Sequence, residues 1–593
     1  MKIKVAKTAG FCMGVRRAVN IVLDRVHADA GSIYCLGPLI HNPQVVEFLK
    51  AQGVRDISGL DEIQSGTVVI PSHGIRPELR ESLAHRGIGF CDATCPRVAR
   101  VHGLIKKYYA QGFLVLILGD TGHAEVEALL GEASGQAIVI QKPEQVSALP
   151  DAEKVLLVAQ TTQSQEVFQA VVEAVKKRYS GLAKDNLVIE NTICDSTRRR
   201  QTEVRKMAGE SEGSGGIEAM VVVGGKASAN TRRLAEISRE QGIASFLVEN
   251  ESELNWEELK NFRAIGLTAG ASTPNWMIRR VYEELSRRNW EARIRPLRWL
   301  YLWLRSLVVS NVYISAGAAS LCLSSGFLQS YPPRYRNLII SFLYVFAMHT
   351  FNILVNRDAV SLNEPMRTRS FDQQRRLWIS LSLMSLFLAL GLCISIGLWS
   401  FIIFSLVSIP GLFYQVRILR RFRTEVFPYR SLAEIPGSKD IFTALGWAVV
   451  CALMPLLDYP DALPLWQKLS PATAMAFILV FGLVFLRSVI QDFRDLQGDR
   501  MVGRETLPIA LGERRTRGLL ITVVAVLVMA LVLLYFFKQV PVLALWMLLP
   551  VAYAGLTIRW FTRRTIVQGL RAESLVDFTF ILAGLVVILD KVV

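Results

Sequence analysis

The 593-residue sequence contains eight cysteines, and no two of them form a CxxC pair. This absence excludes a zinc ribbon and a thioredoxin-like site, because both need two closely spaced cysteines. Three cysteines instead lie far apart in the polar front half: Cys12 in GFCMGVRRAV, Cys95 in DATCPRVARVHG and Cys194 in NTICDSTRRRQ. Three such thiolates could hold four irons and leave one iron without a protein ligand, the open position that substrate chemistry needs. The front half therefore indicates a metalloenzyme.

Two further features are missing. The opening MKIKVAKTAG lacks the pattern of a signal peptide, so we expect the front half to stay in a reducing cytoplasm, where thiols and iron–sulfur clusters persist. No flavin or nicotinamide fingerprint occurs in the sequence either. Cys322, Cys393 and Cys451 lie in apolar runs and are interpreted as small packing residues rather than disulfide partners.

The chain has two compositional regimes. Its mean hydropathy of +0.32 is high for a protein with 20% charged residues. Up to about Trp290 short apolar runs alternate with charge-rich helical stretches, which predicts an α/β fold. After Arg305 long apolar runs alternate with arginine-rich loops, and the connecting WEARIRPLRWLYLWLR is suited to a membrane surface. We expect an α/β domain over 1–285, a linker over 286–307 and an all-α membrane domain over 308–593.

The back half contains about nine apolar runs of the roughly twenty residues that a bilayer requires. They begin near Val308, Asn337, Leu377, Trp399, Phe442, Ala472, Leu519, Val542 and Leu575. Every second loop is rich in arginine, as cytoplasmic loops are: Arg357–Arg376, Arg417–Lys439, Arg487–Arg517 and Arg559–Arg571. An odd number of spans then places the front domain in the cytoplasm and Val593 outside, in a multi-pass protein of the inner (cytoplasmic) membrane. We attribute most of the net charge of +16 to these cytoplasmic loops. No nucleic-acid partner is expected.

Polar side chains follow several strand-like runs of the front half. They are His41 in LIHNPQVV, His73 in IPSHG, His123 and Glu125 in TGHAEVE, Thr161 and Thr162 in AQTTQS, Ser228 and Asn230 in GGKASANTRRL, and Ser272 in LTAGASTP. Hydroxyl, amide and imidazole groups in strand-end loops suit an anionic phosphate ligand. Taken singly, each is more simply an ordinary loop residue. Three histidine turns alongside three cysteine turns favour a shared site.

In this order, across residues 1 to about 285, the motifs resemble 4-hydroxy-3-methylbut-2-enyl diphosphate (HMBPP) reductase, the last enzyme of the non-mevalonate isoprenoid pathway. The resemblance implies three similar α/β lobes around one [4Fe–4S] cluster held by Cys12, Cys95 and Cys194. It implies proton delivery by Glu125 and a ferredoxin or flavodoxin electron donor. It assigns substrate contacts to His41, His73, His123, Thr161, Thr162, Ser228, Asn230 and Ser272.

The activity implied is reductive dehydroxylation of HMBPP to isopentenyl and dimethylallyl diphosphates, with the open iron as Lewis acid. Glu125 suits proton delivery because a neighbouring diphosphate favours the acid form of a carboxyl. A cluster-bearing redox sensor, the alternative class, would require neither Glu125 nor the phosphate-binding set. Many family members have a second serine where this sequence has Ala229, so one phosphate hydrogen bond worth about 1 kcal/mol would be lost.

The back half carries an aspartate motif of its own. QDFRDLQGDRMVGRETLP places Asp492, Asp495 and Asp499 at offsets of three and four, on one face of a helix at the cytoplasmic end of a span. Clustered carboxylates suit Mg²⁺ carrying a diphosphate, and the ordinary alternative is a solvated acidic helix end. RSVIQDFRDLQGDRMVGRETLPIALG resembles the second aspartate-rich motif of UbiA-type intramembrane prenyltransferases. The resemblance implies a prenyl diphosphate, a prenyl acceptor and lipid as partners.

The first aspartate motif of that family is degraded. FNILVNRDAV retains Asn352 but has Asn356 and Val360 where the family has aspartates. Other residues could contact diphosphate instead, namely Arg357, Arg420 and Lys439. Two interpretations therefore remain. The chain is either a reductase fused to an active prenyltransferase, or a reductase with a catalytically weak membrane half that anchors it and binds prenyl diphosphates.

Overall fold

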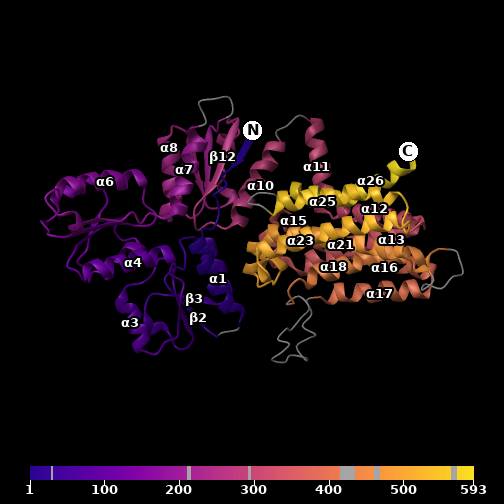
Figure 1. Ribbon diagram of the computed structural model, residues 1–593, viewed down its shortest axis with the longest axis horizontal. Helices are drawn as coiled ribbons and strands as arrows, with labels where there is room; N and C mark the ends of the chain where they lie inside the picture. The colour runs from indigo at the N-terminus through magenta and orange to yellow at the C-terminus, as the bar shows by residue number, and fades with distance from the viewer. Residues whose placement is uncertain are drawn as a thin grey trace. The chain divides into compact units, whose positions relative to one another are not determined.

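The computed structural model describes residues 1–28, 31–209, 216–291, 295–414, 435–459, 468–562 and 570–592. The chain divides into two compact units, Met1–Asn289 and Trp290–Val593. The first unit is α/β, and the described residues of the second form helices without strands (Figure 1). The predicted change from an α/β fold to a helical fold is confirmed.

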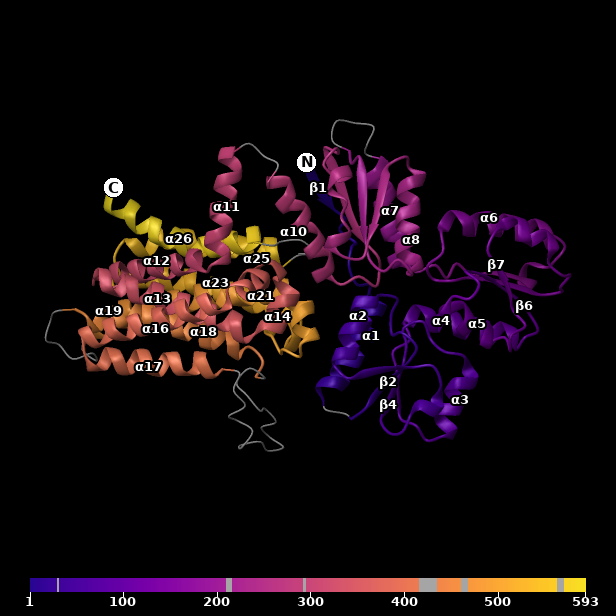
Figure 2. The same cartoon turned by 180° about the vertical axis from the view of Figure 1, so that it is seen from behind.

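The first unit contains three four-stranded sheets in which every strand pair is parallel (Figures 1 and 2). Their strand orders are β3-β2-β4-β5, β7-β6-β8-β9 and β1-β12-β10-β11. The strands are β1 Lys2–Val5, β2 Ile33–Leu36, β3 Val54–Ile57, β4 Thr67–Ile70, β5 Phe90–Asp92, β6 Leu114–Leu118, β7 Ile138–Ile140, β8 Val155–Ala159, β9 Leu187–Ile189, β10 Ala219–Val223, β11 Ala244–Val248 and β12 Ala264–Ala269.

The three sheets are copies of one topology. Read from its other edge, the third sheet is β11-β10-β12-β1, so the amino-terminal strand β1 occupies the place of β5 and β9. Residues Lys2–Val5 pair in register with 264–267. The helices of this unit are α1 Met13–His27, α2 Pro43–Ala51, α3 Pro77–His85, α4 Pro96–Tyr109, α5 Ala124–Gly131, α6 Gln165–Arg178, α7 Asp195–Gly209, α8 Ala229–Glu240, α9 Trp256–Leu259 and α10 Asn275–Glu291.

The lobe cores follow from the sequence pattern. Strands β6 (LVLIL) and β8 (VLLVA) are buried almost throughout, as central strands of a parallel sheet covered on both faces should be. Helix α6 buries Phe168, Val171, Val172 and Val175, a helical stripe that packs with β8 in one hydrophobic cluster. Short 3₁₀ turns η1 Leu60–Glu62, η2 Pro143–Ala148, η3 Lys184–Asn186 and η5 Glu251–Glu253 complete the unit.

In the second unit a helix stands at each of the nine predicted positions. The helices are α11 Arg295–Val309, α12 Val312–Leu328, α13 Tyr335–Val355, α14 Arg357–Asn363, α15 Pro365–Gln373, α16 Arg375–Ile396, α17 Leu398–Phe413, α18 Ser438–Ala448, the π-helical η8 Val449–Leu453, α19 Met454–Leu457, α21 Pro471–Met501, α22 Leu507–Ala510, α23 Glu513–Phe536, α24 Leu543–Trp546, α25 Leu548–Phe561 and α26 Leu570–Val592. Val593 and most of the Arg417–Lys439 loop lie outside the described residues.

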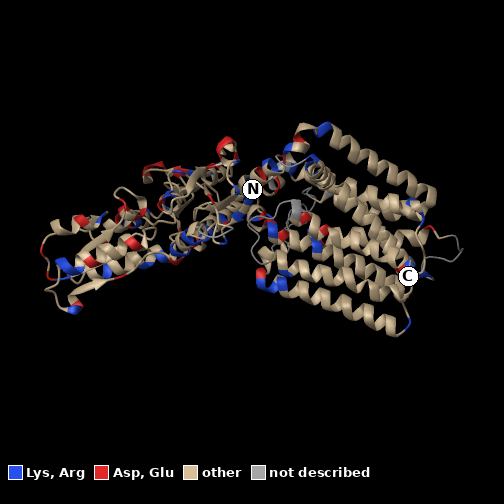
Figure 3. Ribbon diagram, turned by 90° about the horizontal axis from the view of Figure 1, so that it is seen from above, with Lys and Arg blue, Asp and Glu red and all other residues tan. Residues whose placement is uncertain are grey.

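Within the described residues, seven helices are long and apolar enough to cross a membrane, or eight if α11 and α12, bent by 70°, form one span. Helix α17, with 16 residues, is shorter. Lys, Arg, Asp and Glu gather toward the helix ends in this unit, and long uncharged stretches lie between them (Figure 3).

Small residues allow close helix packing in this unit. A Cβ added to Gly317 of α12 would lie 2.9 Å from Cβ of Phe580 in α26, and one added to Gly584 would lie 2.8 Å from Cβ of Ser320. Close approach through small residues is the main way in which membrane helices gain packing energy, because lipid is as apolar as their side chains.

Candidate functional site

The three cysteines of the first unit occupy equivalent positions. Each follows the edge strand of its sheet and immediately precedes a helix: Cys12 before α1, Cys95 before α4 and Cys194 before α7. Each backbone N–H donates to a carbonyl in the loop after the neighbouring strand: Cys12 to Ala271 (3.0 Å), Cys95 to Ser72 (2.9 Å) and Cys194 to Thr161 (3.0 Å). All three thiols therefore lie at helix amino termini.

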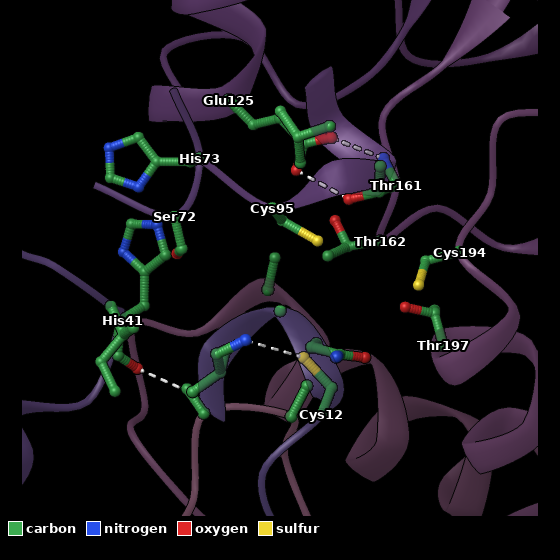
Figure 4. Close-up of a pocket in the computed structure, with 18 of the residues that line it drawn as sticks. Cys12, His41, Ser72, His73, Cys95, Glu125, Thr161, Thr162, Cys194 and Thr197 are labelled. Atoms are coloured by element: carbon green, nitrogen blue, oxygen red, sulfur yellow. Dashed lines mark hydrogen bonds between the residues drawn. The ribbon is translucent and has the colours of Figure 1, made fainter. Parts of the chain in front are cut away.

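One pocket brings these cysteines together with the other front-half residues named from the sequence (Figure 4). Its lining includes Cys12, Cys95, Cys194, His41, His73, His123, Glu125, Thr161, Thr162, Ser228, Asn230 and Ser272. The repeated topology explains this convergence. His41, His123 and Ser228 follow the first strand of each lobe, whereas His73, Thr161 and Ser272 follow the third. The carboxyl ends of parallel strands meet at one edge of a sheet, and the three edges contribute to the same pocket.

The three histidines form one cluster. The ring centroids of His41 and His73 lie 5.4 Å apart, and those of His41 and His123 lie 5.1 Å apart. Burial, then the charges that His41 and His123 would carry, lower the pKa of His73 to about 3. Burial is also the main cause that lowers the pKa of His123 to about 4. At neutral pH these rings are therefore neutral hydrogen-bonding groups.

Several buried polar atoms of this pocket lack a partner in the structure. They are Nε2 of His41, Nδ1 of His73, Oγ1 of Thr162 and Oδ1 of Asn230. A buried polar group without a hydrogen bond costs about 1–3 kcal/mol, so four of them in one pocket indicate a polar ligand that satisfies them. The neutral histidines could donate to the oxygens of an anion.

Glu125 is buried, with 4% of its surface exposed. Its Oε1 accepts a hydrogen bond from the backbone N–H of Thr161, and its Oε2 accepts one from Oγ1 of Thr161, both at 2.8 Å. Burial raises the pKa of Glu125 although both bonds from Thr161 oppose the rise. The carboxyl is thus held in one orientation and biased toward its acid form, as a proton donor requires.

The donor set fits a cluster better than a single ion. Among the described residues, no three His, Cys, Asp or Glu side chains lie close enough to hold one metal ion. In a four-iron cluster each cysteine binds a different iron, so the thiolates must stand apart. A Cβ on Gly14 would lie 2.4 Å from Sγ of Cys95, so glycine keeps this space open. Burial raises the pKa of Cys95, and repulsion from Cys12 and Cys194 adds to the rise, so positive irons would stabilise the thiolates.

Sequence reasoning missed other residues of this site. Ser72 and Thr197 line the pocket, and Oγ of Ser72 donates to the carbonyl of Leu39 at 3.1 Å. The buried guanidinium of Arg200 donates to the carbonyl of Gly10 at 2.5 Å and lies near Cys12 and Cys194. Ser72 could have been predicted as a site residue, because it adjoins His73 in IPSHG. Nothing in the run Arg198–Arg200 distinguishes the buried arginine.

The second unit has a pocket of its own at the end of α21. It is lined by Asn352, Asn356, Tyr414, Gly437, Lys439, Asp440, Asp492, Arg504, Glu505 and Thr506. Of the predicted residues, Asn352, Asn356, Asp492 and Lys439 line it. Arg357, Asp495 and Asp499 do not. Nε of Arg494 donates to Oδ1 of Asp495 at 3.1 Å, and Nδ2 of Asn363 donates to Oδ1 of Asp499 at 3.1 Å. The sequence analysis missed Asp440, because a single aspartate in GSKD carries no spacing signal.

The two units match two different family models. Residues 3–286 match the family model of the LytB protein, and residues 312–572 match that of the UbiA prenyltransferase family. A 4-hydroxy-3-methylbut-2-enyl diphosphate reductase from Aquifex aeolicus is 39% identical over 280 residues, which are 47% of this chain and 93% of that protein. The corresponding protein from Geobacter sulfurreducens is 38% identical over 285 residues, 48% of this chain and 97% of that protein. A solved UbiA homologue from Archaeoglobus fulgidus bound to DMAPP and Mg²⁺ is 15% identical, with a TM-score of 0.34 over 48% of this chain and 98% of that chain.

Because the match extends over nearly the whole length of these relatives, the chain belongs to the LytB protein family. Its first unit is an HMBPP reductase domain of the non-mevalonate pathway, and this domain is fused to a UbiA-family prenyltransferase domain. The apolar helices and the UbiA match make the chain a multi-pass membrane protein. Both resemblances described from the sequence are confirmed.

Proposed function

We propose that Cys12, Cys95 and Cys194 hold one [4Fe–4S] cluster and that the surrounding pocket binds HMBPP beside it. The observation that carries this proposal is the equivalent placement of three free cysteines at three helix amino termini around one pocket. The unpartnered atoms of His41, His73, Thr162 and Asn230 support a diphosphate ligand, and we also assign substrate contacts to His123, Thr161, Ser228 and Ser272.

In this proposal Glu125 delivers a proton and Thr161 holds its carboxyl in place. The reaction consumes two electrons and two protons, breaks the C4–oxygen bond, and releases the oxygen as water. When bound, the cluster supplies the electrons and a Lewis-acidic iron. Neutral imidazoles bind the diphosphate by hydrogen bonds. A ferredoxin or flavodoxin would reduce the cluster.

We further propose that the membrane unit binds a prenyl diphosphate through Mg²⁺ at the pocket that contains Asp492. Two buried carboxylate oxygens of this pocket, Oδ2 of Asp440 and Oδ2 of Asp492, lack hydrogen-bond partners, and such oxygens suit Mg²⁺. Asp495 and Asp499 lie on the same helix and would join only after leaving their present partners. Transfer to an acceptor is proposed to be slow, because neutral Asn352 and Asn356 replace anionic ligands. An anchor that binds isoprenoids without transfer is the second candidate.

Asp492→Asn is expected to weaken magnesium-dependent binding of a prenyl diphosphate by about tenfold or more, because it replaces an anionic ligand with a neutral one. Asn356→Asp is expected to keep or raise transfer. The measurement is binding and transfer of geranyl diphosphate by the full chain in nanodiscs, with and without Mg²⁺. Asp372→Asn is the matched control, since Asp372 pairs with Arg357 at 2.9 Å outside the pocket. Magnesium-independent binding that Asp492→Asn leaves unchanged would favour the anchor.

For topology we propose nine spans, with α12 and α17 added to the seven long helices, and an inner-membrane location with the reductase domain in the cytoplasm. The alternation of arginine-rich loops supports this orientation. A reporter that is active only in the cytoplasm is therefore expected to give no signal when fused after Val593. The same reporter fused ahead of Met1 should give full signal. A strong signal at the carboxyl end would contradict the odd number of spans.

A further inference from the structure

Three side chains of the membrane pocket share one arrangement. In each, one polar atom is engaged by the protein: Nδ2 of Asn356 donates to Asn352, Oδ1 of Asp440 accepts from Oγ of Ser488 (2.5 Å), and Oδ1 of Asp492 accepts from Nζ of Lys439 (2.8 Å). The second oxygen of each, Oδ1 of Asn356 and Oδ2 of both aspartates, is buried and has no partner. The residues are only 8%, 0% and 1% exposed, in that order.

The two carboxylate oxygens without partners, Oδ2 of Asp440 and Oδ2 of Asp492, belong to neighbouring side chains. The carboxyls of Asp440 in α18 and Asp492 in α21 line one pocket and lie close enough to interact electrostatically. Two ionised carboxylates this close and this buried repel strongly unless a cation or a shared proton lies between them. Three buried oxygens without partners in one pocket match the preference of Mg²⁺ for oxygen ligands.

Lys439 places a fixed positive charge in the same pocket. Its ammonium bonds Asp492 and is near enough to Asp440 and Asp499 to interact with both. Near α13 the pocket offers a second divalent ion only the amides of Asn352, in α13, and of Asn356, the residue after it, and these amides are bonded to each other. The remaining carboxylate of the pocket, that of Glu505, is exposed, and the ammonium of Lys439 and the guanidinium of Arg504 would both repel a second ion.

We propose that this pocket binds diphosphate with a single Mg²⁺, held by Asn356, Asp440 and Asp492, and that the ammonium of Lys439 takes the place of a second metal ion. The inference rests on the proposed prenyl-diphosphate site and specifies which positive charges bind the diphosphate there. A lysine here would let the site dispense with the aspartates of the first motif, because an ammonium needs fewer anionic ligands than Mg²⁺ does.

The test counts metal ions in the full chain in nanodiscs. Mn²⁺ replaces Mg²⁺, and the probe is geranyl S-thiolodiphosphate. The room-temperature electron paramagnetic resonance signal measures free Mn²⁺, so its decrease when the probe is added gives the number of ions bound with each probe molecule. One ion per bound probe is expected, and two would overturn the proposal. Asp440→Asn should weaken Mn²⁺ binding about as strongly as Asp492→Asn, and an unchanged Mn²⁺ affinity in Asp440→Asn would overturn the ligand assignment.

Lys439→Met should lower the affinity for the probe by about tenfold or more at fixed Mn²⁺. Lys439→Arg keeps the charge and should retain most of the affinity. Lys591→Met is the matched control, because Lys591 lies over Phe327 at the carboxyl-terminal ends of α26 and α12. Parental affinity in Lys439→Met would overturn the role of the ammonium, and if this variant fails to fold, the ion count and Asp440→Asn decide. No probe binding at any Mn²⁺ concentration would overturn the proposed site as well, whereas binding with two ions would overturn only this inference.

Discussion

Cys95→Ser is expected to abolish cluster retention and with it HMBPP reduction, a loss of at least about 10³-fold. The residue stands at the amino terminus of α4, and its thiol shares the pocket with Cys12 and Cys194. Serine has nearly the same shape, but its hydroxyl is a poor iron ligand at neutral pH. The measurement is iron and sulfide content and turnover of residues 1–289, expressed alone and reconstituted anaerobically. Relatives that match this unit over 93% and 97% of their length justify testing it alone.

The matched control is Cys91→Ser. Cys91 lies in β5, four positions before Cys95, is partly exposed, and does not line the pocket. It should retain the cluster and parental turnover, so a loss in Cys95→Ser alone would come from the ligand and not from a general effect on thiols or folding. A full complement of iron and sulfide in Cys95→Ser would remove Cys95 from the ligand set.

The local motifs of the reductase site could be predicted from the residues themselves, whereas three similar lobes were expected only because the motifs resemble HMBPP reductase. Cysteines, histidines and small polar residues after apolar runs indicate strand-end loops, because the strand pattern is local. The repeat cannot be recognised from the residues, because equivalent loops differ in sequence. For example, three equivalent helices begin in HNPQVV, GHAEVE and ASANTRR. The edge strand of the third sheet is β1, which comes from the start of the chain and pairs with β12, late in the sequence of the unit. Such a long-range pairing leaves no periodic signal.

In the membrane unit the aspartate spacing correctly predicted one continuous helix, α21, but not which carboxylates face the pocket. That choice depends on partners from elsewhere in the chain. Asn363 ends α14, and its Nδ2 donates to Oδ1 of Asp499. A Cβ on Gly498 would collide with Oδ1 of Asn363, so α14 and α21 pack closely. Lys439 and Asp440 begin α18 and complete the pocket. Periodicity places residues on a helix face, and tertiary contacts decide their neighbours.

Glu125→Gln is expected to leave the cluster in place and to lower turnover of HMBPP by about 10²–10⁴-fold, because it removes a positioned proton donor while preserving shape. The pH profile should change as well. Burial raises the pKa of Glu125, so the parent keeps the acid form to a higher pH than an exposed glutamate and loses activity as pH rises through that pKa. The variant has no group to titrate there, so this decline should vanish. The measurements are turnover against pH and cluster content in residues 1–289.

Three variants separate proton delivery from packing. Glu127→Gln alters the same helix, but Glu127 pairs with Arg76 at 2.5 Å and does not line the pocket, so parental turnover is expected. Thr161→Ser keeps both donors to the Glu125 carboxyl and should remain active, whereas Thr161→Val removes the hydroxyl and should weaken its orientation. A glutamine amide must turn its NH₂ toward one Thr161 donor, so part of the loss in Glu125→Gln could be misplacement. Only loss of proton delivery predicts that the alkaline decline disappears too, and parental turnover in Glu125→Gln would exclude Glu125 as the proton donor.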